Sequence, residues 1–161
     1  MKLAKGLGEF FGLDIDTNAV RVVQLSRTGT GWSLSHYGYT PVDSKITSGD
    51  SPESKRRLGE AIMTAVGQAG VKTSNVAVGL PSNKTFSTII DVPKVPEQEL
   101  KAMMKYQVDQ YIPMSLDEAE VDWALLGESL HAQNQYEILL TSTAKSYAEE
   151  RLELVENLGF N

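Results

Sequence analysis

The stretch FGLDIDTNAVRVVQ, Phe11 to Gln24, decides how the first part of the chain folds. Val, Leu and Ile lie on both sides of its polar turn Asp16-Thr17-Asn18. Two β-rich runs across a short polar turn predict a β-hairpin. A third strand is expected from Gly31 to Val42, because the turn Thr28-Gly29-Thr30-Gly31 introduces it. The chain is therefore expected to open with three successive strands.

A helix is expected after the polar loop that ends at Ser51. Ser51 can cap the helix, Pro52 suits its first position, and Gly70 can close it. The apolar residues in between recur every three or four positions, which gives the helix one apolar face. The almost wholly apolar run from Asn75 to Pro81 then predicts a buried central strand that is reached by a helical crossover. This order indicates an α/β layer.

The second half of the sequence predicts a different arrangement. Its elements are expected in the order βαββα, at residues 86–92, 97–112, 119–126, 135–143 and 146–158. This order indicates a small antiparallel sheet with two helices on one face. We place the domain boundary so that residues 1–83 form the first domain and 84–161 the second. The fold class is α/β, or α+β when the second half is counted.

Composition excludes several classes of function. Of the 161 residues, 41% are hydrophobic and 22% charged, which is ordinary for a soluble globular protein. The net charge of -6 disfavours nucleic acid as a partner, because an acidic surface repels phosphate backbones. The absence of cysteine excludes disulfides and thiolate sites and fits a reducing cytoplasm. His36 and His131 lack an acid–base partner at a telling spacing, so they predict no triad or metal site.

The opening hairpin also resembles the first phosphate loop of the actin, Hsp70 and sugar-kinase superfamily. Further motifs follow along the chain: GLPS at 79–82, VPK at 92–94, QYIP at 110–113, LDE at 116–118 and DW at 122–123. Their order and spacing resemble those of PilM-type proteins of type IV pilus assembly, which are FtsA-like members of that superfamily. The resemblance covers about residues 11 to 160.

The resemblance implies a partial actin-like, FtsA-like fold. Residues up to about Leu80 would form most of the subdomain called 1A, and residues from about 84 to 160 the inserted βαββα subdomain 1C. Family members continue further, with the remainder of 1A, two more subdomains, the second phosphate loop and the adenosine contacts. The sequence is therefore expected to be an N-terminal fragment, and the uncovered face of its 1A sheet is expected to favour self-association.

The resemblance also implies roles for the turn residues. Asp14 would hold hydrated Mg²⁺, and Asp16, Thr17 and Asn18 would lie beside the phosphates of ATP. ATP and Mg²⁺ are thus implied for the full-length protein, and no cofactor is expected for the present chain. Asp16 stands where relatives usually have glycine, so either Mg²⁺ binding is altered or nucleotide binding is weakened. An alternative for Asp14 is a local role, bonding backbone N–H groups at the strand end.

The family resemblance implies a scaffold rather than an enzyme. PilM lies on the cytoplasmic face of the inner membrane and holds the N-terminal peptide of PilN, extended in a groove between 1A and 1C. Other platform proteins and the assembly ATPase are further expected partners. The candidate peptide contacts are Pro81, Lys84, Phe86, Tyr106, Tyr111 and Pro113. The alternative is that the two tyrosines pack the helix onto its own sheet; for Met103-Met104 a core role is likewise favoured over an adaptable surface.

Other functions remain open from the sequence. One alternative is an FtsA-like cell-division protein or a GspL-like type II secretion protein. Another is an active actin-fold ATPase or kinase. That activity needs a catalytic carboxylate or glutamine and the second phosphate loop, and neither is recognisable in this sequence.

Overall fold

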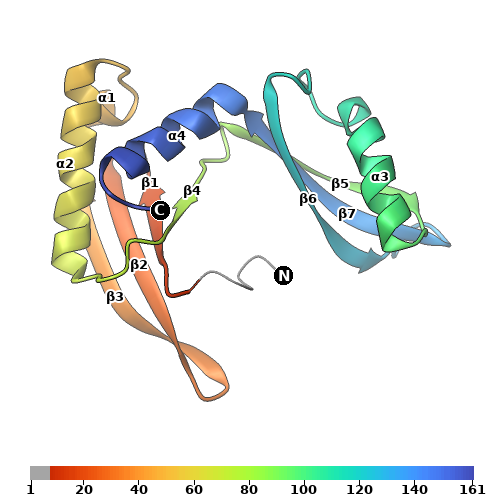
Figure 1. Ribbon diagram of the computed structural model, residues 1–161, viewed down its shortest axis with the longest axis horizontal. Coiled ribbons are helices and arrows are strands. Elements are labelled where there is room, and N and C mark those ends of the chain that lie inside the picture. The colour runs from red at the N-terminus through yellow and green to blue at the C-terminus, as the bar shows by residue number, and fades with distance from the viewer. Residues whose placement is uncertain (1–7) are drawn as a thin grey trace. The chain divides into compact units, whose positions relative to one another are not determined.

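The computed structural model describes residues 8–161 and divides them into two compact units (Figure 1). The first unit contains the residues up to Pro81 together with Glu150–Asn161, and the second contains Ser82–Glu149. The division after Pro81 lies close to the predicted one. The predicted range 84–161 is wrong at its end, because the last residues of the chain belong to the first unit.

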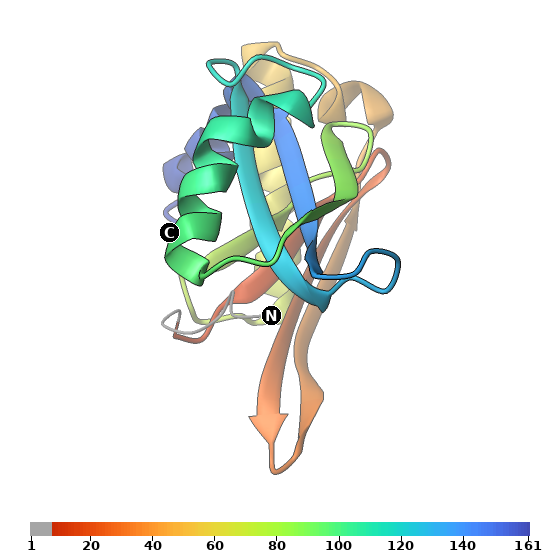
Figure 2. The ribbon, with the colours of Figure 1, turned by 90° about the vertical axis from the view of Figure 1, so that its right-hand side faces the viewer.

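The first unit is built on a four-stranded sheet in the order β3-β2-β1-β4. Its strands are β1 (Phe11–Ile15), β2 (Ala19–Thr28), β3 (Gly31–Pro41) and β4 (Val76–Gly79). β1, β2 and β3 pair antiparallel, and β4 pairs parallel to β1, which confirms the hairpin, the third strand and the crossover. The β2–β3 hairpin continues past the last pair between β1 and β2, Gly12 with Val23 (Figure 2).

β4 lies at an edge of this sheet and not at its centre, which corrects the prediction. Val76 and Val78 are half-buried and pack against the core, whereas Ala77 and Gly79 are exposed. The apolar residues of β4 thus form a strand that is covered on one face only. Apolar composition alone does not distinguish such an edge strand from a central one.

Three helices accompany the first sheet: α1 (Ser44–Thr47), α2 (Pro52–Ala69) and part of α4 (Lys145–Asn157). α2 begins and ends as predicted. The Ser51 side chain accepts a hydrogen bond from the Ser54 amide at 3.1 Å, and Gly70 closes the helix with a φ of 70°. α1 was not predicted, because four residues are too few to show a helical period.

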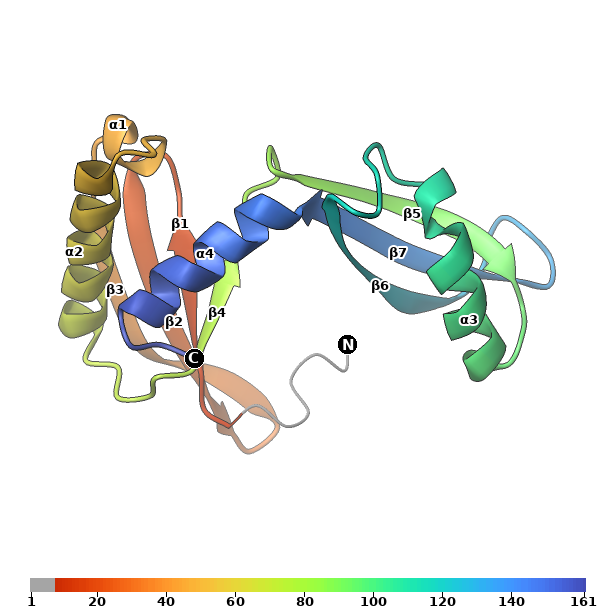
Figure 3. The same cartoon turned by 45° about the horizontal axis from the view of Figure 1, so that its top comes forward.

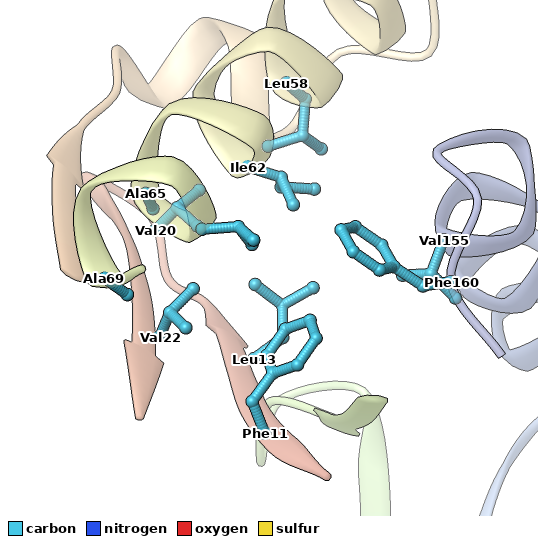
Figure 4. Close-up of a cluster of buried hydrophobic side chains, with 11 residues drawn as sticks. Phe11, Leu13, Val20, Val22, Leu58, Ile62, Ala65, Ala69, Val155 and Phe160 are labelled. Atoms are coloured by element: carbon cyan, nitrogen blue, oxygen red, sulfur yellow. The ribbon is translucent and has the colours of Figure 1, made fainter. Parts of the chain in front are cut away.

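The core of the first unit joins segments from both ends of the chain (Figure 4). α2 contributes Leu58 and Ile62, β1 contributes Phe11, and the C-terminal segment contributes Val155 and Phe160. The rings of Phe11 and Phe160 meet edge to face, 5.3 Å apart. Complete burial of one such side chain contributes about 1.5–3 kcal/mol. The last helix therefore packs on the first unit from its middle onward and does not become the second helix of the other sheet.

Backbone hydrogen bonds fix the chain's last residue in the same unit. The Asn161 amide donates to the Ser74 carbonyl at 2.8 Å, and the Val76 amide donates to the Asn161 carbonyl at 2.9 Å. These two bonds hold the segment after α4 next to the start of β4.

The second unit is built on a three-stranded antiparallel sheet in the order β5-β7-β6. Its strands are β5 (Thr85–Pro93), β6 (Ala119–Glu128) and β7 (Gln135–Ala144). α3 (Glu97–Gln107) and the short 3-10 helix η1 (Val108–Gln110) pack on one face of it (Figure 3). Leu100, Met104, Ile138 and Leu140 are among the most buried residues of this core. The core role that was favoured for the methionine pair is thus confirmed, since Met103 also packs there.

Candidate functional site

The first candidate site is the turn between β1 and β2. Asp14 lies on β1 between the buried Leu13 and the half-buried Ile15, so its carboxylate is on the exposed face of the strand. Asp16, Thr17 and Asn18 form the turn that follows. The structure therefore brings the four predicted nucleotide-site residues together at one end of the hairpin.

Arg21 is the central residue of this site, although no sequence motif indicated it. Its Nη1 atom donates to Asp14 Oδ2 at 2.8 Å and to Asp16 Oδ2 at 3.1 Å. Asp14 and Arg21 are direct cross-strand partners in the β1–β2 register. All three side chains are about half exposed, so each ion pair by itself contributes little to folding stability. What the pairs determine is where the carboxylates point.

The Thr17 amide is also engaged. It donates to Asp16 Oδ1 at 2.7 Å, while the Asp16 amide donates to the Ala19 carbonyl at 2.9 Å. The bond from Thr17, and after it the bond from Arg21, lower the pKa of Asp16 below its usual range. The pKa of Arg21 is raised, first by Asp14 and then by Asp16. The structure thus favours charge on Asp16 and Arg21.

Neighbouring segments hold the turn from outside. The Thr47 hydroxyl of α1 donates to the Thr17 carbonyl at 2.8 Å, and the Val42 amide donates to the Asn18 carbonyl at 2.9 Å. The carbonyls of Thr17 and Asn18 are therefore satisfied by residues that follow β3. The unpredicted helix α1 has a clear role here, because it supports the turn.

The turn residues do not present a ready Mg²⁺ site. Three of the four carboxylate oxygens of Asp14 and Asp16 accept hydrogen bonds from Arg21 or Thr17. Within residues 8–161 no group of three or more His, Asp or Glu side chains is placed to hold a metal ion. A hydrated Mg²⁺ ion keeps several waters in octahedral geometry, and these waters need carboxylate oxygens that can accept their hydrogen bonds. In this arrangement Asp14 and Asp16 do not fit the hydrated ion that the phosphate-loop resemblance implies.

The candidate peptide contacts fall into different environments. Tyr106 is 76% exposed on α3, and Pro113 is exposed as well. Phe86 and Tyr111 are half-buried and pack together with the core of the second unit, as the alternative for Tyr111 anticipated. Lys84 is exposed, and its ammonium lies 5.6 Å from the centre of the Tyr147 ring.

Pro81 belongs to the first unit, whereas the other five candidate contacts belong to the second. Of the candidate contacts in the second unit, Lys84, Tyr106 and Pro113 have exposed side chains that a partner can reach.

The two histidines have local environments that differ from each other. His36 is half-buried, and its Nδ1 atom lies 2.8 Å from the Ala69 carbonyl at the end of α2. His131 is exposed in the loop before β7. His36 thus ties β3 to the end of α2.

The two units together define a mixed α/β protein whose fold matches part of two solved structures. One is a PilM-PilN type IV pilus biogenesis complex, with 21% identity, a TM-score of 0.76, and coverage of 95% of this chain and 45% of that one. The other is the cytoplasmic domain of EpsL, an inner-membrane component of the type II secretion system of Vibrio cholerae, with 12% identity, a TM-score of 0.53, and coverage of 95% and 54%. The present chain therefore spans about half the length of the solved chains it matches.

The family follows from the sequence match. Residues 12–161 match the family described as type IV pilus assembly protein PilM. The chain belongs to this family.

In the part of the chain that the structure describes, each helix is too short or too polar to cross a membrane.

Proposed function

We propose that this protein is a cytoplasmic scaffold of the type IV pilus assembly platform and that it binds the N-terminal peptide of PilN. The observation that carries the proposal is the family match over residues 12–161, together with the similarity to a chain of a PilM-PilN complex. The protein would lie at the inner face of the cytoplasmic membrane as a peripheral component. Other platform proteins and the assembly ATPase would be further partners.

The second unit offers features that suit an extended peptide. Its outer strands, β5 and β6, each pair only with β7 among the described residues. Edge strands present unpaired N–H and C=O groups, which an extended peptide can use. Tyr106 is an exposed aromatic side chain on α3 of the same unit. Exposed tyrosines are frequent anchors in interfaces, because they bury a large area at small entropic cost.

The test is a calorimetric titration of the chain with a peptide that copies the N-terminus of the cognate PilN. Tyr106→Ala is expected to weaken binding by about 2 kcal/mol, or roughly 30-fold, as for a true anchor. Tyr37→Ala is the matched control, since Tyr37 is 71% exposed on β3 of the first unit and should leave binding unchanged. Thermal melts of each variant check that it is folded.

Two outcomes would contradict the proposal. A folded Tyr106→Ala variant with unaltered affinity removes Tyr106 from the site. If the peptide binds neither this chain nor the full-length protein, PilN is not the partner.

A second candidate function is that of a type II secretion component. The likeness to the cytoplasmic domain of EpsL favours it, although the TM-score of 0.53 is lower than that of the PilM match. The same titration with a peptide from the cognate type II partner separates the two. The higher affinity identifies the function.

No enzyme activity is proposed for the present chain. We propose that the full-length protein binds ATP, with the adenosine contacts and second phosphate loop supplied by later residues. For the present chain we expect no steady ATP turnover. Turnover that disappears on Asp14→Ala would contradict this expectation.

A further inference from the structure

We infer that Arg21 is the built-in counter-cation of the β1–β2 turn and that it takes the place of a divalent metal ion at Asp14 and Asp16. The inference concerns the first unit only. It is independent of peptide binding, so either proposal can fail without the other.

The geometry of the guanidinium supports this inference. A single nitrogen, Nη1, donates to both carboxylates, at 2.8 Å to Asp14 and 3.1 Å to Asp16. A metal ion that bridged the two carboxylates would need the same Oδ2 atoms. Guanidinium and metal therefore compete for one position, and the guanidinium is covalently part of the hairpin.

Arg21 is positioned by the strands on both sides of it. In the sheet register it pairs with Asp14 on β1 and with Tyr39 on β3. Its Cζ atom lies 6.0 Å from the centre of the Tyr39 ring, within the range of a cation–π interaction. This row of three residues places the guanidinium beside the turn before any ligand arrives. Such preorganisation lowers the entropy that the ion pairs cost.

Asp16 completes the arrangement as an internal anion. The Thr17 amide would face a phosphate oxygen if the turn held a nucleotide, as the superfamily resemblance implies. Here that amide donates to Asp16 Oδ1 at 2.7 Å, and the other oxygen of the same carboxylate accepts from Arg21. Asp16 thus accepts hydrogen bonds from the Thr17 amide and from the Arg21 guanidinium, the two groups that would otherwise bind a phosphate. The glycine expected at this position has no side chain to do so.

The magnitude of the effect follows from electrostatics. Each ion pair is half exposed and weak, so Arg21 lowers the affinity for a divalent ion chiefly by its charge and by its occupation of the two oxygens. A unit charge within a few ångströms of a divalent ion changes its affinity by on the order of tenfold in a water-exposed setting. Removal of the Arg21 charge is therefore expected to produce a measurable gain of binding.

The experiment is a Mn²⁺ titration in which NMR measures the paramagnetic broadening of the Thr17 and Asn18 amide signals. Arg21→Gln is expected to show broadening at roughly tenfold lower Mn²⁺ than the wild-type chain does. Arg27→Gln is the matched control, because it removes the same charge from the exposed end of the same strand and should behave like wild type. Arg21→Lys keeps the charge and is expected to stay close to wild type.

A second variant keeps the inference testable if Arg21→Gln does not fold. Asp16→Gly frees the Thr17 amide and removes one of the two carboxylates that the guanidinium contacts, so it is expected to bind inorganic triphosphate about tenfold more tightly than wild type without added Mg²⁺. Equal Mn²⁺ broadening in wild type and Arg21→Gln would overturn the role of Arg21. Equal triphosphate binding by wild type and Asp16→Gly would overturn the role of Asp16.

Discussion

The two sheets share a plan and differ in the chemistry of their open faces. Each buries one face under helices. On the other face of the first sheet, the cross-strand pairs Val23 with Tyr37 and Leu25 with Leu34 are exposed. Trp32, also on β3, is exposed as well.

The open face of the second sheet carries polar rows on both sides of one apolar row, in which Leu139 pairs with Ile89 and with Ala124. Ser87 and Asp122 flank Thr141 in one row, and Asp91 pairs with Glu137 in another. A sheet that is covered by helices on one face only can therefore expose its other face to water when that face carries polar rows. The apolar rows of the first sheet indicate a face that is normally covered.

The largest expected effect is on the stability of the first unit, because residues after α4 contribute to its core. Phe160→Ala is expected to destabilise this unit by about 3–5 kcal/mol, because a buried aromatic ring is lost. Amide hydrogen exchange should accelerate in β1 and β4 while the second sheet keeps its protection. Leu152→Ala is a suitable control, since Leu152 is exposed on α4. Equal acceleration in both sheets would argue against the division into two units.

A somewhat smaller effect is expected at Gly38, where β3 meets α2. A Cβ added at Gly38 would lie 2.1 Å from the Ala65 carbonyl oxygen, so α2 would have to move. Gly38→Ala is expected to cost about 1–3 kcal/mol or more. Gly67→Ala is the matched control on α2, because it meets no neighbour and should stabilise the helix by about 0.5–1 kcal/mol. Thermal melts of the two variants should shift in opposite directions.

The comparison of open faces predicts self-association through the first sheet. We expect the chain to be a dimer or larger at high protein concentration, with the exposed apolar rows in contact. The double variant Val23→Thr, Tyr37→Thr is expected to weaken this association by roughly tenfold. Ile89→Thr on the second sheet should leave it unchanged. Light scattering that finds only monomer up to about millimolar wild-type concentration would refute the contact.

The smallest effect is a pH dependence at Asp16. Because its pKa is lowered in the folded state, charged Asp16 stabilises the fold above the ordinary aspartate range, about pH 4. This contribution is lost as the pH falls through the lowered pKa. Asp16→Asn should therefore reduce the melting temperature slightly at about pH 7 and less at about pH 2.5. A difference that grows on acidification would contradict the sign.

Local patterns predicted most elements of the fold. The polar turn at Asp16-Thr17-Asn18, the cap at Ser51 and the closing Gly70 each act within a few residues, so sequence alone identified the hairpin and α2. The antiparallel pairing of the second sheet was also predicted, whereas its strand order, β5-β7-β6, was not.

Long-range packing was not predictable in the same way. The placement of Phe160 against Phe11 depends on residues from opposite ends of the chain, and no periodicity reports such a contact. The edge position of β4 likewise depends on which strands pair with it.

The candidate site was predicted in part. Asp14, Asp16, Thr17 and Asn18 were named because of the phosphate-loop resemblance, and they do lie together, while their role at a nucleotide stays a prediction. Arg21 was missed, because a turn of three residues at 16–18 predicts a different register, in which Asp14 is opposite Val20. In the structure four residues separate the paired strands, so Asp14 is opposite Arg21, and opposite charges in such cross-strand pairs are favourable. The hydrogen bond from Thr17 to Asp16 is a matter of side-chain rotamer, which a single sequence does not determine.

The insertion of the second unit into the first has a consequence for the order of folding during synthesis. The second unit is continuous, from Ser82 to Glu149, so it can fold once that stretch has left the ribosome. The first unit is interrupted, and its core waits for Val155 and Phe160 even though β1 and β2 emerge much earlier. α2 can cover part of the hairpin early, but Phe11 lacks the ring of Phe160 throughout translation of the insert. Chaperone binding to the nascent chain should accordingly concentrate on the segment that contains β1 and β2, and it should persist until α4 and Phe160 have been synthesised.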